Sequence, residues 1–355
     1  MPETKPRRKL SNASFAWLAV TVLFGLMAAA SLWRSMDQPA PAVTRLPAFD
    51  LQGHRGARGL APENTLPGFE TALALGVTTL EMDIGMTADG VLVVHHDRGL
   101  NPARTRGPDG QWLNEDAATS YLKDQSYAAL AGYDVGRARP DSDEAARFPE
   151  QAGRDGVAIP KLRDVIARAE ALSGGTIRYN IETKVSPEDP ESSPDWRAMT
   201  EALIVVIQDA GVAERATVQS FDWRSLLLVQ EKAPDIITSY LTAEQLWLDN
   251  IRRGKDGASP WTADFDVDRY EASVPKLIKA AGGRIWSPYY RDLRNADLAE
   301  ARRLGLHVIV WTVNDPGDMA ALIDQGVDGI ITDYPDRLRS VMETKGMTLP
   351  PAFQP

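Results

Sequence analysis

Three carboxylates in two strand-like segments are spaced so that they can hold one divalent cation. Glu81 and Asp83 lie two residues apart in an apolar segment, so in a strand both project from the same face. Two anions this close repel each other unless a cation lies between them. Glu182 offers a third carboxylate in the segment YNIETK, where Lys184 shares its face. Oxygen ligands without cysteine suit Mg²⁺ or Ca²⁺ better than Zn²⁺, so the pattern predicts a site for one of these two ions.

Histidines gather in the same part of the chain. His54 closes the first strand-like segment and is followed by Arg55 and a glycine, a combination that suits binding of an oxyanion. His95 and His96 follow a short apolar run, where strand parity sends them to opposite faces without deciding which one meets the carboxylates. Asp97 can orient one imidazole. Three of the four histidines of the chain lie between His54 and His96, which favours a shared site over unrelated strand ends.

Other strand ends carry weaker signals. The segment Pro62 to Thr65 precedes a predicted helix, and it is either a turn with helix-capping residues or part of the site. Trp311 is either a pocket wall or barrel core, and core is typical of an isolated tryptophan in a strand. His307 begins a strand and is expected to be structural. The remaining polar or aromatic strand ends are Ser220-Phe221-Asp222, Thr312-Val313-Asn314 and Thr332 to Asp336.

Strand-like and helix-like segments alternate from Phe49 onward, the pattern of βα units around a mostly parallel sheet. The predicted strands are 49–53, 78–84, 91–95, 177–181, 216–220, 236–241, 284–287, 307–312 and 329–332. The predicted helices are 66–75, 161–171, 196–210, 224–232, 271–281, 296–304 and 316–324. The link from Ile84 to Val91 is too short for a crossover helix, so it is either an extended return or a hairpin with one strand outside the main sheet.

Two stretches interrupt this alternation and are predicted insertions. Residues 98–157 are rich in Gly, Pro and Asp, and residues 242–270 contain Trp247 and Trp261. Long loops in a compact domain are usually functional or disordered, and in a (β/α)₈ barrel the βα loops border the active site. We therefore expect these insertions to influence substrate choice.

The N-terminal segment predicts a membrane address. Residues 1–14 carry four basic side chains, and residues 15–33 are almost wholly apolar and long enough to span a bilayer as a helix. The positive-inside rule then places residues 1–14 in the cytoplasm and the main domain outside it, in the periplasm if the cell is Gram-negative. Residues 34–47 are Pro-rich and resemble a tether. A transmembrane signal anchor is the favoured interpretation, and a cleaved signal peptide that yields a secreted protein is the alternative.

Composition limits the remaining function classes. In the 355 residues, 43% are apolar and 25% are charged, which fits a globular protein with ample core. The net charge of −10 argues against nucleic acid as a partner. With no cysteine, the chain has no disulfide, no thiolate metal site and no thiol nucleophile.

The residues discussed above resemble those of the glycerophosphodiester phosphodiesterase family, which is related to the phosphatidylinositol-specific phospholipases C. The resemblance extends from about residue 48 to 340, in family order, and leaves residues 341–355 as a tail. The motifs that carry it are H-R-G at His54, P-E-N-T at Pro62, E-x-D at Glu81, T-x-D-G at Thr87, V-V-x-H-D ending at Asp97, I-P-x-L at Ile159, N-I-E-x-K at Asn180, S-F-D at Ser220, W-T-V-N at Trp311 and G-V-D-G-I-I-T-D-Y-P at Gly326. The resemblance implies a TIM (β/α)₈ barrel with insertions in its βα loops.

The resemblance also implies roles for single residues. His54 and His96 match the histidines that act as general acid and base, and His95 stands where the family usually has an aliphatic residue. Arg55 and Lys184 match cationic phosphate contacts. The three metal ligands, for one Ca²⁺ or Mg²⁺, match Glu81, Asp83 and Glu182, and Trp311 is a further candidate for contact with substrate.

The implied activity is metal-dependent hydrolysis of glycerophosphodiesters to glycerol 3-phosphate and an alcohol. Resemblance to the phospholipases C implies that the glycerol 2-hydroxyl attacks first and gives a cyclic phosphate, and direct attack by water is the alternative. Two further readings stay open: a lipid phosphodiesterase, such as a lysophospholipase D or a sphingomyelinase D-like enzyme, and a non-catalytic, membrane-tethered binding module. The expected partners are a small glycerophosphodiester and, through the N-terminal helix, a membrane.

Overall fold

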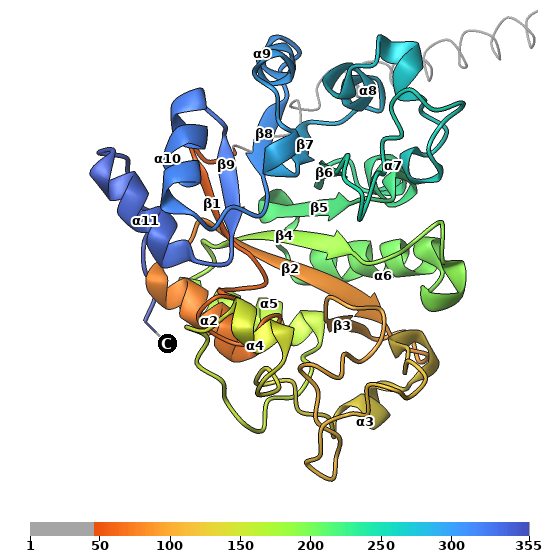
Figure 1. The fold of residues 1–355 in the computed structure, drawn as a ribbon, viewed down its shortest axis with the longest axis vertical. Helices are drawn as coiled ribbons and strands as arrows, with labels where there is room; N and C mark the ends of the chain where they lie inside the picture. The colour runs from red at the N-terminus through yellow and green to blue at the C-terminus, as the bar shows by residue number, and fades with distance from the viewer. Residues whose placement is uncertain (1–45, 355) are drawn as a thin grey trace, which may run out of the picture. The chain divides into compact units, whose positions relative to one another are not determined.

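The carboxyl ends of eight parallel strands, which carry most of the candidate residues, meet at one edge of a closed barrel. A computed structural model of the chain describes residues 46–354. The eight strands follow the order β1-β9-β8-β7-β6-β5-β4-β2, and pairing of β1 with β2 closes the barrel (Figure 1). Their bounds are β1 Asp50–Gly53, β2 Thr79–Met86, β4 Arg178–Thr183, β5 Ala216–Ser220, β6 Ile237–Thr242, β7 Ile285–Pro288, β8 His307–Val310 and β9 Gly329–Thr332. The TIM-barrel prediction for this part of the chain is confirmed.

The ninth strand forms a hairpin with β2. Strand β3 (Leu92–Val94) pairs antiparallel with β2, with Ile84 opposite Val94. In the turn between them, the Thr87 N–H donates to the Val91 carbonyl at 3.0 Å. Gly90 has a φ of 77°, a left-handed conformation that glycine adopts without steric cost. Of the two readings of this short link, the hairpin is therefore correct, and β3 stays outside the barrel.

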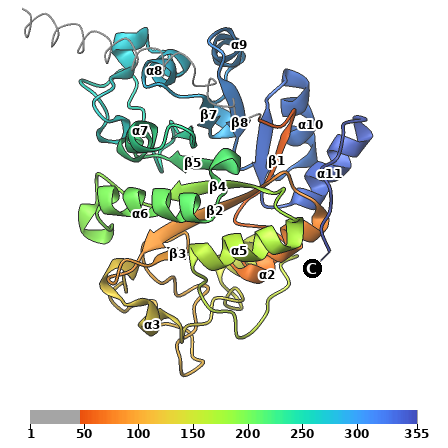
Figure 2. The ribbon, with the colours of Figure 1, turned by 180° about the vertical axis from the view of Figure 1, so that it is seen from behind.

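Helices surround the barrel and largely match the sequence periodicity. Their bounds are α2 Leu66–Leu75, α5 Leu162–Ser173, α6 Trp196–Asp209, α7 Trp223–Lys232, α8 Val274–Ala280, α9 Asn295–Arg303, α10 Pro316–Gln325 and α11 Pro335–Thr344. From the opposite side, α5 and α6 lie along the outside of β2, β3 and β4 (Figure 2). The helix predicted from Glu271 begins later, because Glu271 and Ala272 have φ values of 59° and 54°. Ser273 then caps α8 by accepting from the Lys276 N–H.

The barrel interior has one polar and one apolar half. On β1, β2, β4 and β5, side chains form a hydrogen-bonded chain: Gln52 donates to Asp50 at 2.9 Å, and Asn180 donates to Gln52 at 2.7 Å and to Gln219 at 2.9 Å. Gln219 in turn donates to Glu81 at 2.7 Å. The other half is filled by four isoleucines, one from each of β6 to β9: Ile237, Ile285, Ile309 and Ile331. The polar half thus supports the predicted metal ligands from below.

Both predicted insertions follow strands at the carboxyl edge. The segment 98–157 contains two short helices, α3 (Tyr127–Leu130) and α4 (Asp143–Arg147), which the sequence periodicity missed. It has its own apolar cluster, which includes Leu100, Leu122 and Leu130, and Arg106 ties it together through ion pairs with two aspartates. The segment 242–270 links β6 to α8 through two 3₁₀ turns, Pro260–Thr262 and Val267–Tyr270.

The C-terminal residues pack against the barrel. Helix α11 continues to Thr344, so the boundary expected at residue 340 falls inside it. Beyond the helix, the Phe353 N–H donates to the Leu73 carbonyl at 2.9 Å. Arg339 also donates to the carbonyls of Gly76 and Pro350, at 2.6 and 2.7 Å. Residues after 340 thus cover the end of α2.

The membrane predictions lie mostly beyond the described part of the chain. The cytoplasmic segment 1–14, the anchor or signal peptide 15–33 and all but the last residues of the linker 34–47 fall in residues 1–45. Within residues 46–354, none of the helices combines the length and the apolar character needed to span a bilayer.

Candidate active site

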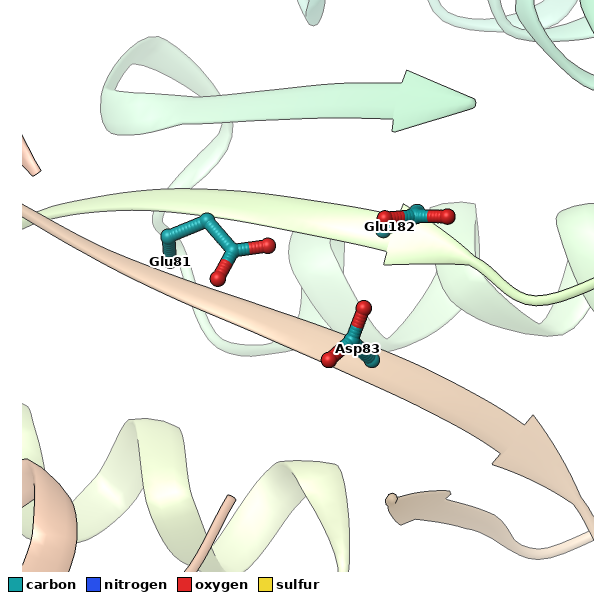
Figure 3. Close-up of side chains that lie close together, drawn as sticks. All are labelled: Glu81, Asp83 and Glu182. Atoms are coloured by element: carbon teal, nitrogen blue, oxygen red, sulfur yellow. The ribbon is translucent and has the colours of Figure 1, made fainter. Parts of the chain in front are cut away.

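The predicted metal ligands come together within the barrel mouth. Glu81 and Asp83 lie on β2, and Asp83 pairs in register with Glu182 on the neighbouring β4. Each of the three residues offers one oxygen within 4.8 Å of the others, and all three side chains are buried (Figure 3). Three carboxylates with only oxygen donors fit a hard cation such as Mg²⁺ or Ca²⁺. The predicted grouping is thus present.

The electrostatics of the triad also fit a cation. Burial and the neighbouring Asp83 raise the pKa of Glu81 well above its usual range. Burial raises the pKa of Glu182 to about 7, with Asp83 adding to the shift and Lys184 opposing it. Burial acts on Asp83 in the same sense, but His96 in its protonated form, Arg55 and Lys184 more than reverse it and hold its pKa below the usual range. A bound divalent ion would remove the repulsion that raises the first two.

Backbone and amide groups fix the triad in place. The Arg55 N–H donates to Glu81 Oε2 at 2.8 Å, and Arg55 reaches this position with a left-handed φ of 52°. The Asn64 amide donates to Asp83 Oδ2 at 2.8 Å, and its carbonyl oxygen accepts from the Asp83 N–H at 3.2 Å. Thr65, next along, caps α2 by accepting from the Gly68 N–H. Both readings of the segment 62–65 therefore hold, since one residue caps a helix and another supports the site.

Two cations border the triad. Arg55 Nε lies 3.3 Å from Asp83 Oδ2, and Lys184 Nζ lies 2.8 Å from Glu182 Oε1 and 3.6 Å from Asp83 Oδ1. Glu63 also pairs with Arg55 at 3.0 Å. Both predicted phosphate contacts are therefore at the site, where their charge offsets that of the carboxylates.

His54 is oriented by a residue from the far end of the chain. Its Nδ1 lies 2.6 Å from Asp333 Oδ1, just after β9. Asn314, after β8, donates to Asp333 Oδ2 at 2.7 Å, and its own side-chain oxygen accepts from the Asp333 N–H at 3.0 Å. Burial lowers the pKa of His54, which favours the neutral imidazole, and His54 in turn holds the pKa of Asp333 at about 2 against burial. With Nδ1 bound to Asp333, Nε2 lies 4.0 Å from Glu81.

His96 has a second, similar arrangement. Its Nδ1 lies 2.7 Å from Asp97 Oδ1, so Asp97 does orient an imidazole as the sequence indicated. Asp97 Oδ2 accepts from Asn101 at 2.7 Å and from Arg104 at 2.5 Å. Burial, Arg55 and Lys184 lower the pKa of His96 to about 3. His95 is buried, and its Nε2 finds no hydrogen-bond partner among the described residues.

Glu63 connects the two halves of this arrangement. Its carboxylate lies 3.0 Å from Arg55 Nη1, 2.5 Å from Arg58 Nε and 2.8 Å from Arg104 Nη1. Arg104 belongs to the insertion 98–157 and pairs also with Asp97. A continuous ionic network therefore runs from Arg55, beside His54, to Asp97, beside His96.

The remaining candidates are placed as follows. Trp311 is half-buried, packs on the interior isoleucines and donates from Nε1 to the Ser287 carbonyl at 2.8 Å, so it is both core and part of the barrel mouth. His307 begins β8 and lies 3.8 Å from Asp328, in keeping with a structural role. Trp261 is buried, whereas Trp247 is 60% exposed.

Sequence reasoning missed several supporting residues. Asp333 and Asn314 appeared only as weak strand-end signals, and Gln219 and Arg104 were not singled out. Strand parity gives part of the missing signal, because Asp333 lies two residues beyond the interior Ile331. Nothing in the spacing of Arg104 indicates its partners, since the insertion that carries it has no regular periodicity.

A comparison with family models matches residues 54–337 to the glycerophosphoryl diester phosphodiesterase family. The Bacillus subtilis (strain 168) protein YqiK is 30% identical over 295 residues, which cover 82% of this chain and 98% of that protein. The glycerophosphodiester phosphodiesterase of the same organism is 29% identical over 298 residues, covering 81% and 84% of the two chains.

Solved structures give the same picture. The crystal structure of a Silicibacter pomeroyi DSS-3 protein named for glycerophosphoryl diester phosphodiesterase activity has a TM-score of 0.75 and 35% identity, covering 86% of this chain and 97% of that one. A phosphodiesterase of Oleispira antarctica, solved with the product sn-glycerol-3-phosphate, has a TM-score of 0.59 and 20% identity, covering 84% and 97%. At 20% identity, the likeness to the Oleispira antarctica protein shows a shared fold.

The triad predicts saturable binding of Ca²⁺ or Mg²⁺ that stabilises the protein. An ion at about 100 times its dissociation constant adds about 2.7 kcal/mol to the free energy of unfolding, visible as a rise in melting temperature. Glu182→Gln removes one charged ligand, so we expect the dissociation constant of the ion to rise at least about tenfold. Asp89→Asn, in the β2–β3 turn, is the matched control and should bind the ion with the wild-type dissociation constant. Equal ion dependence in all three proteins would contradict the site.

Proposed function

This chain belongs to the glycerophosphoryl diester phosphodiesterase family, and from that premise we propose that it hydrolyses glycerophosphodiesters to glycerol 3-phosphate and an alcohol with the aid of one divalent cation, Ca²⁺ or Mg²⁺. Membership makes it a phosphoric diester hydrolase, like the glycerophosphodiester phosphodiesterase of Bacillus subtilis. The Oleispira antarctica neighbour holds sn-glycerol-3-phosphate, the product expected here.

One observation carries the proposal: two imidazoles, each fixed at Nδ1 by a carboxylate, border a buried carboxylate triad that is flanked by two cations. Hydrolysis of a phosphodiester requires a proton to leave the attacking oxygen and another to reach the departing alcohol. His54 and His96 each have Nε2 left for these transfers, and in the structure Arg55 Nε donates to His54 Nε2 at 3.3 Å. Both have lowered pKa values, so both are mainly neutral near pH 7 and either can act as the base, and the histidine that acts as the acid first takes up the proton that it gives to the departing alcohol.

The charged side chains bind and orient the phosphate. Arg55 and Lys184 offset the negative charge of the phosphate. These two cations lower the pKa of His96, and the bound phosphate, being negative, would raise it again. Glu81, Asp83 and Glu182 would hold the ion, which when bound stabilises charge on the phosphate oxygens. Asp333 and Asp97 keep the imidazoles in one tautomer and orientation, the role that a carboxylate takes beside a catalytic histidine.

The proposal includes a place for the enzyme in the cell. The basic residues 1–14 and the apolar residues 15–33 support a single-pass membrane protein with the barrel outside the cytoplasm, or a secreted enzyme if the segment is cleaved. Fractionation of cells that express the full chain, with protease added to intact spheroplasts, separates these two outcomes from a cytoplasmic location.

The purified full-length protein should release glycerol 3-phosphate from glycerophosphocholine and glycerophosphoethanolamine. EDTA should abolish the release, and Ca²⁺ or Mg²⁺ should restore it. Activity that survives EDTA at full rate would remove the cation from the proposal. If neither substrate nor any acylated analogue is hydrolysed while the ion is bound, the chain is a binding module.

His54→Ala and His96→Ala should each lower kcat by about a hundredfold or more, because each removes one proton-transfer group. KM should change much less, since Arg55 and Lys184 remain in place. His307→Ala is the control and should keep near-normal kcat, because His307 begins β8 and the site lies at the other end of the strands. Near-normal turnover in either of the first two variants would refute the paired roles.

Arg104 is expected to act as a positioning residue for His96. Arg104→Met breaks the ion pairs with Asp97 and Glu63, so kcat should fall by about tenfold to a hundredfold with KM within about threefold of wild type. Arg104→Lys keeps the charge and should restore part of kcat. Arg106→Met, which loosens the same insertion but not the site, should leave kcat nearly unchanged. An equal loss in the Arg106 variant would mean that Arg104 only stabilises the insertion.

A further inference from the structure

Glu81 lies deepest in the barrel of the three carboxylates. Asp83 and Glu182 face each other in register on β2 and β4, whereas Glu81 lies two residues nearer the amino end of β2. Its side chain extends toward the other two, so that all three present oxygens to one point (Figure 3). A glutamate has several rotamers, and its carboxylate stays at this point only if further contacts hold it there.

Each oxygen of Glu81 accepts one hydrogen bond. Oε2 accepts from the Arg55 backbone N–H at 2.8 Å, and Oε1 accepts from the side-chain amide of Gln219 at 2.7 Å. Gln219 lies on β5, in register with Glu182 on β4, and is 1% exposed. A carboxylate oxygen has two lone pairs, so both oxygens keep one for an ion. Of the side chains in residues 46–354, only that of Gln219 donates a hydrogen bond to Glu81.

The amide of Gln219 is itself held by a chain of buried polar side chains. Asn180 donates from its one amide nitrogen to Gln52 Oε1 at 2.7 Å and to Gln219 Oε1 at 2.9 Å. Gln52 donates to Asp50, which also accepts from the Thr79 hydroxyl at 2.6 Å. All five side chains are buried, so water does not compete for these contacts.

The two ends of this chain decide the direction of each amide in it. Asp50 and Glu81 are carboxylates, and an ionised carboxylate only accepts hydrogen bonds. Gln52 and Gln219 must therefore direct their N–H groups outward, which leaves both of their oxygens facing Asn180. A reversed Gln219 would present its oxygen to Glu81 Oε1 and repel it. The chain thus holds Gln219 in the one orientation that can donate to Glu81.

This direction leaves one buried oxygen without a partner. Asn180 gives both N–H groups to the two glutamines, and its Oδ1 has no hydrogen-bond partner within residues 46–354. Asn180 is 2% exposed. An unpaired buried oxygen costs stability, and such costs are typical of functional sites rather than of parts that serve the fold alone.

We propose, on the basis of the function above, that Gln219 is a positioning residue whose amide holds Glu81 in place for the divalent cation. Gln219 directs an N–H at Glu81 and so does not itself bind the ion. It acts as the outer group that orients a metal ligand, with Asn180 and Gln52 behind it. Loss of the amide therefore weakens ion binding, whereas His54 and His96 keep their own carboxylate partners.

Gln219→Met keeps the length of the side chain and removes the amide. We expect the dissociation constant of Ca²⁺ or Mg²⁺ to rise by about tenfold to a hundredfold, measured by titration calorimetry on the full-length protein without substrate. The ion concentration for half-maximal hydrolysis of glycerophosphoethanolamine should rise by the same factor. Saturating ion should then restore kcat to within about threefold of wild type, because the proton-transfer groups are intact.

Gln230→Met is the matched control. The Gln230 amide donates to the Thr238 and Tyr240 hydroxyls, both at 2.9 Å, and so joins α7 to β6 outside the barrel. Its loss removes as many hydrogen bonds as the change at Gln219, but the dissociation constant of the ion should stay at the wild-type value.

Asn180→Leu tests the chain at a residue that does not contact Glu81. Loss of its amide frees Gln219 to turn, so the dissociation constant of the ion should rise by about threefold to tenfold. Combined with Gln219→Met, the change at Asn180 should add little, because Asn180 acts only through Gln219. Gln219→Asn, which keeps a polar group but is too short to reach Glu81, takes the place of Gln219→Met if that variant does not fold.

The outcomes separate this proposal from the proposed function. A wild-type dissociation constant in the Gln219 variants, with ion binding in the wild type, would overturn the positioning role and leave the proposed function standing. Independent, additive effects of the changes at Asn180 and Gln219 would also overturn it, since they would indicate a general loosening of the barrel interior. A loss of kcat that saturating ion does not restore would place the effect of Gln219 outside ion binding and overturn it too. If the wild type binds no divalent ion, the cation of the proposed function fails as well.

Discussion

Repulsion among three buried carboxylates is the constraint around which the site is built. Glu81, Asp83 and Glu182 meet because β2 and β4 are neighbours in register, and burial makes their charge costly. The chain offsets this cost with Arg55 and Lys184 and with hydrogen bonds from neighbouring amides. The compensation is incomplete, since Glu81 and Glu182 keep raised pKa values. A divalent cation bound between the carboxylates would remove the remaining repulsion.

Paired charges also fix the orientation of the two histidines. Each imidazole binds a carboxylate through Nδ1, and each carboxylate is held by a further group: Asn314 for Asp333, and Arg104 for Asp97. Because Glu63 joins three arginines, the insertion after β3 becomes part of the support of the barrel mouth. A buried network of this kind is stable only when every charge is paired. Removal of one member leaves its partners as buried, unpaired charges, which destabilises the fold.

The barrel mouth divides into a charged and an aromatic side, and the interior beneath it divides in the same way. Polar side chains on β1, β2, β4 and β5 lie below the triad, while isoleucines of β6 to β9 lie below the rings of Phe221, Tyr289 and Trp311. Trp311 belongs to both layers, since it packs on the isoleucines and contacts the outer rings.

The sequence alone determined the order of the strands and of most helices, because these follow from local periodicity, but it did not predict α3, α4 or α11. It also indicated the carboxylate triad from strand spacing, whereas the choice of His96 over His95 and the roles of Arg55 and Lys184 came from the family resemblance. It did not indicate which distant segments meet. Asp333 orients His54 because closure of the barrel pairs β1 with β9, from opposite ends of the chain. Arg104 and Trp247 lie on insertions without periodicity, so only tertiary packing decided their partners.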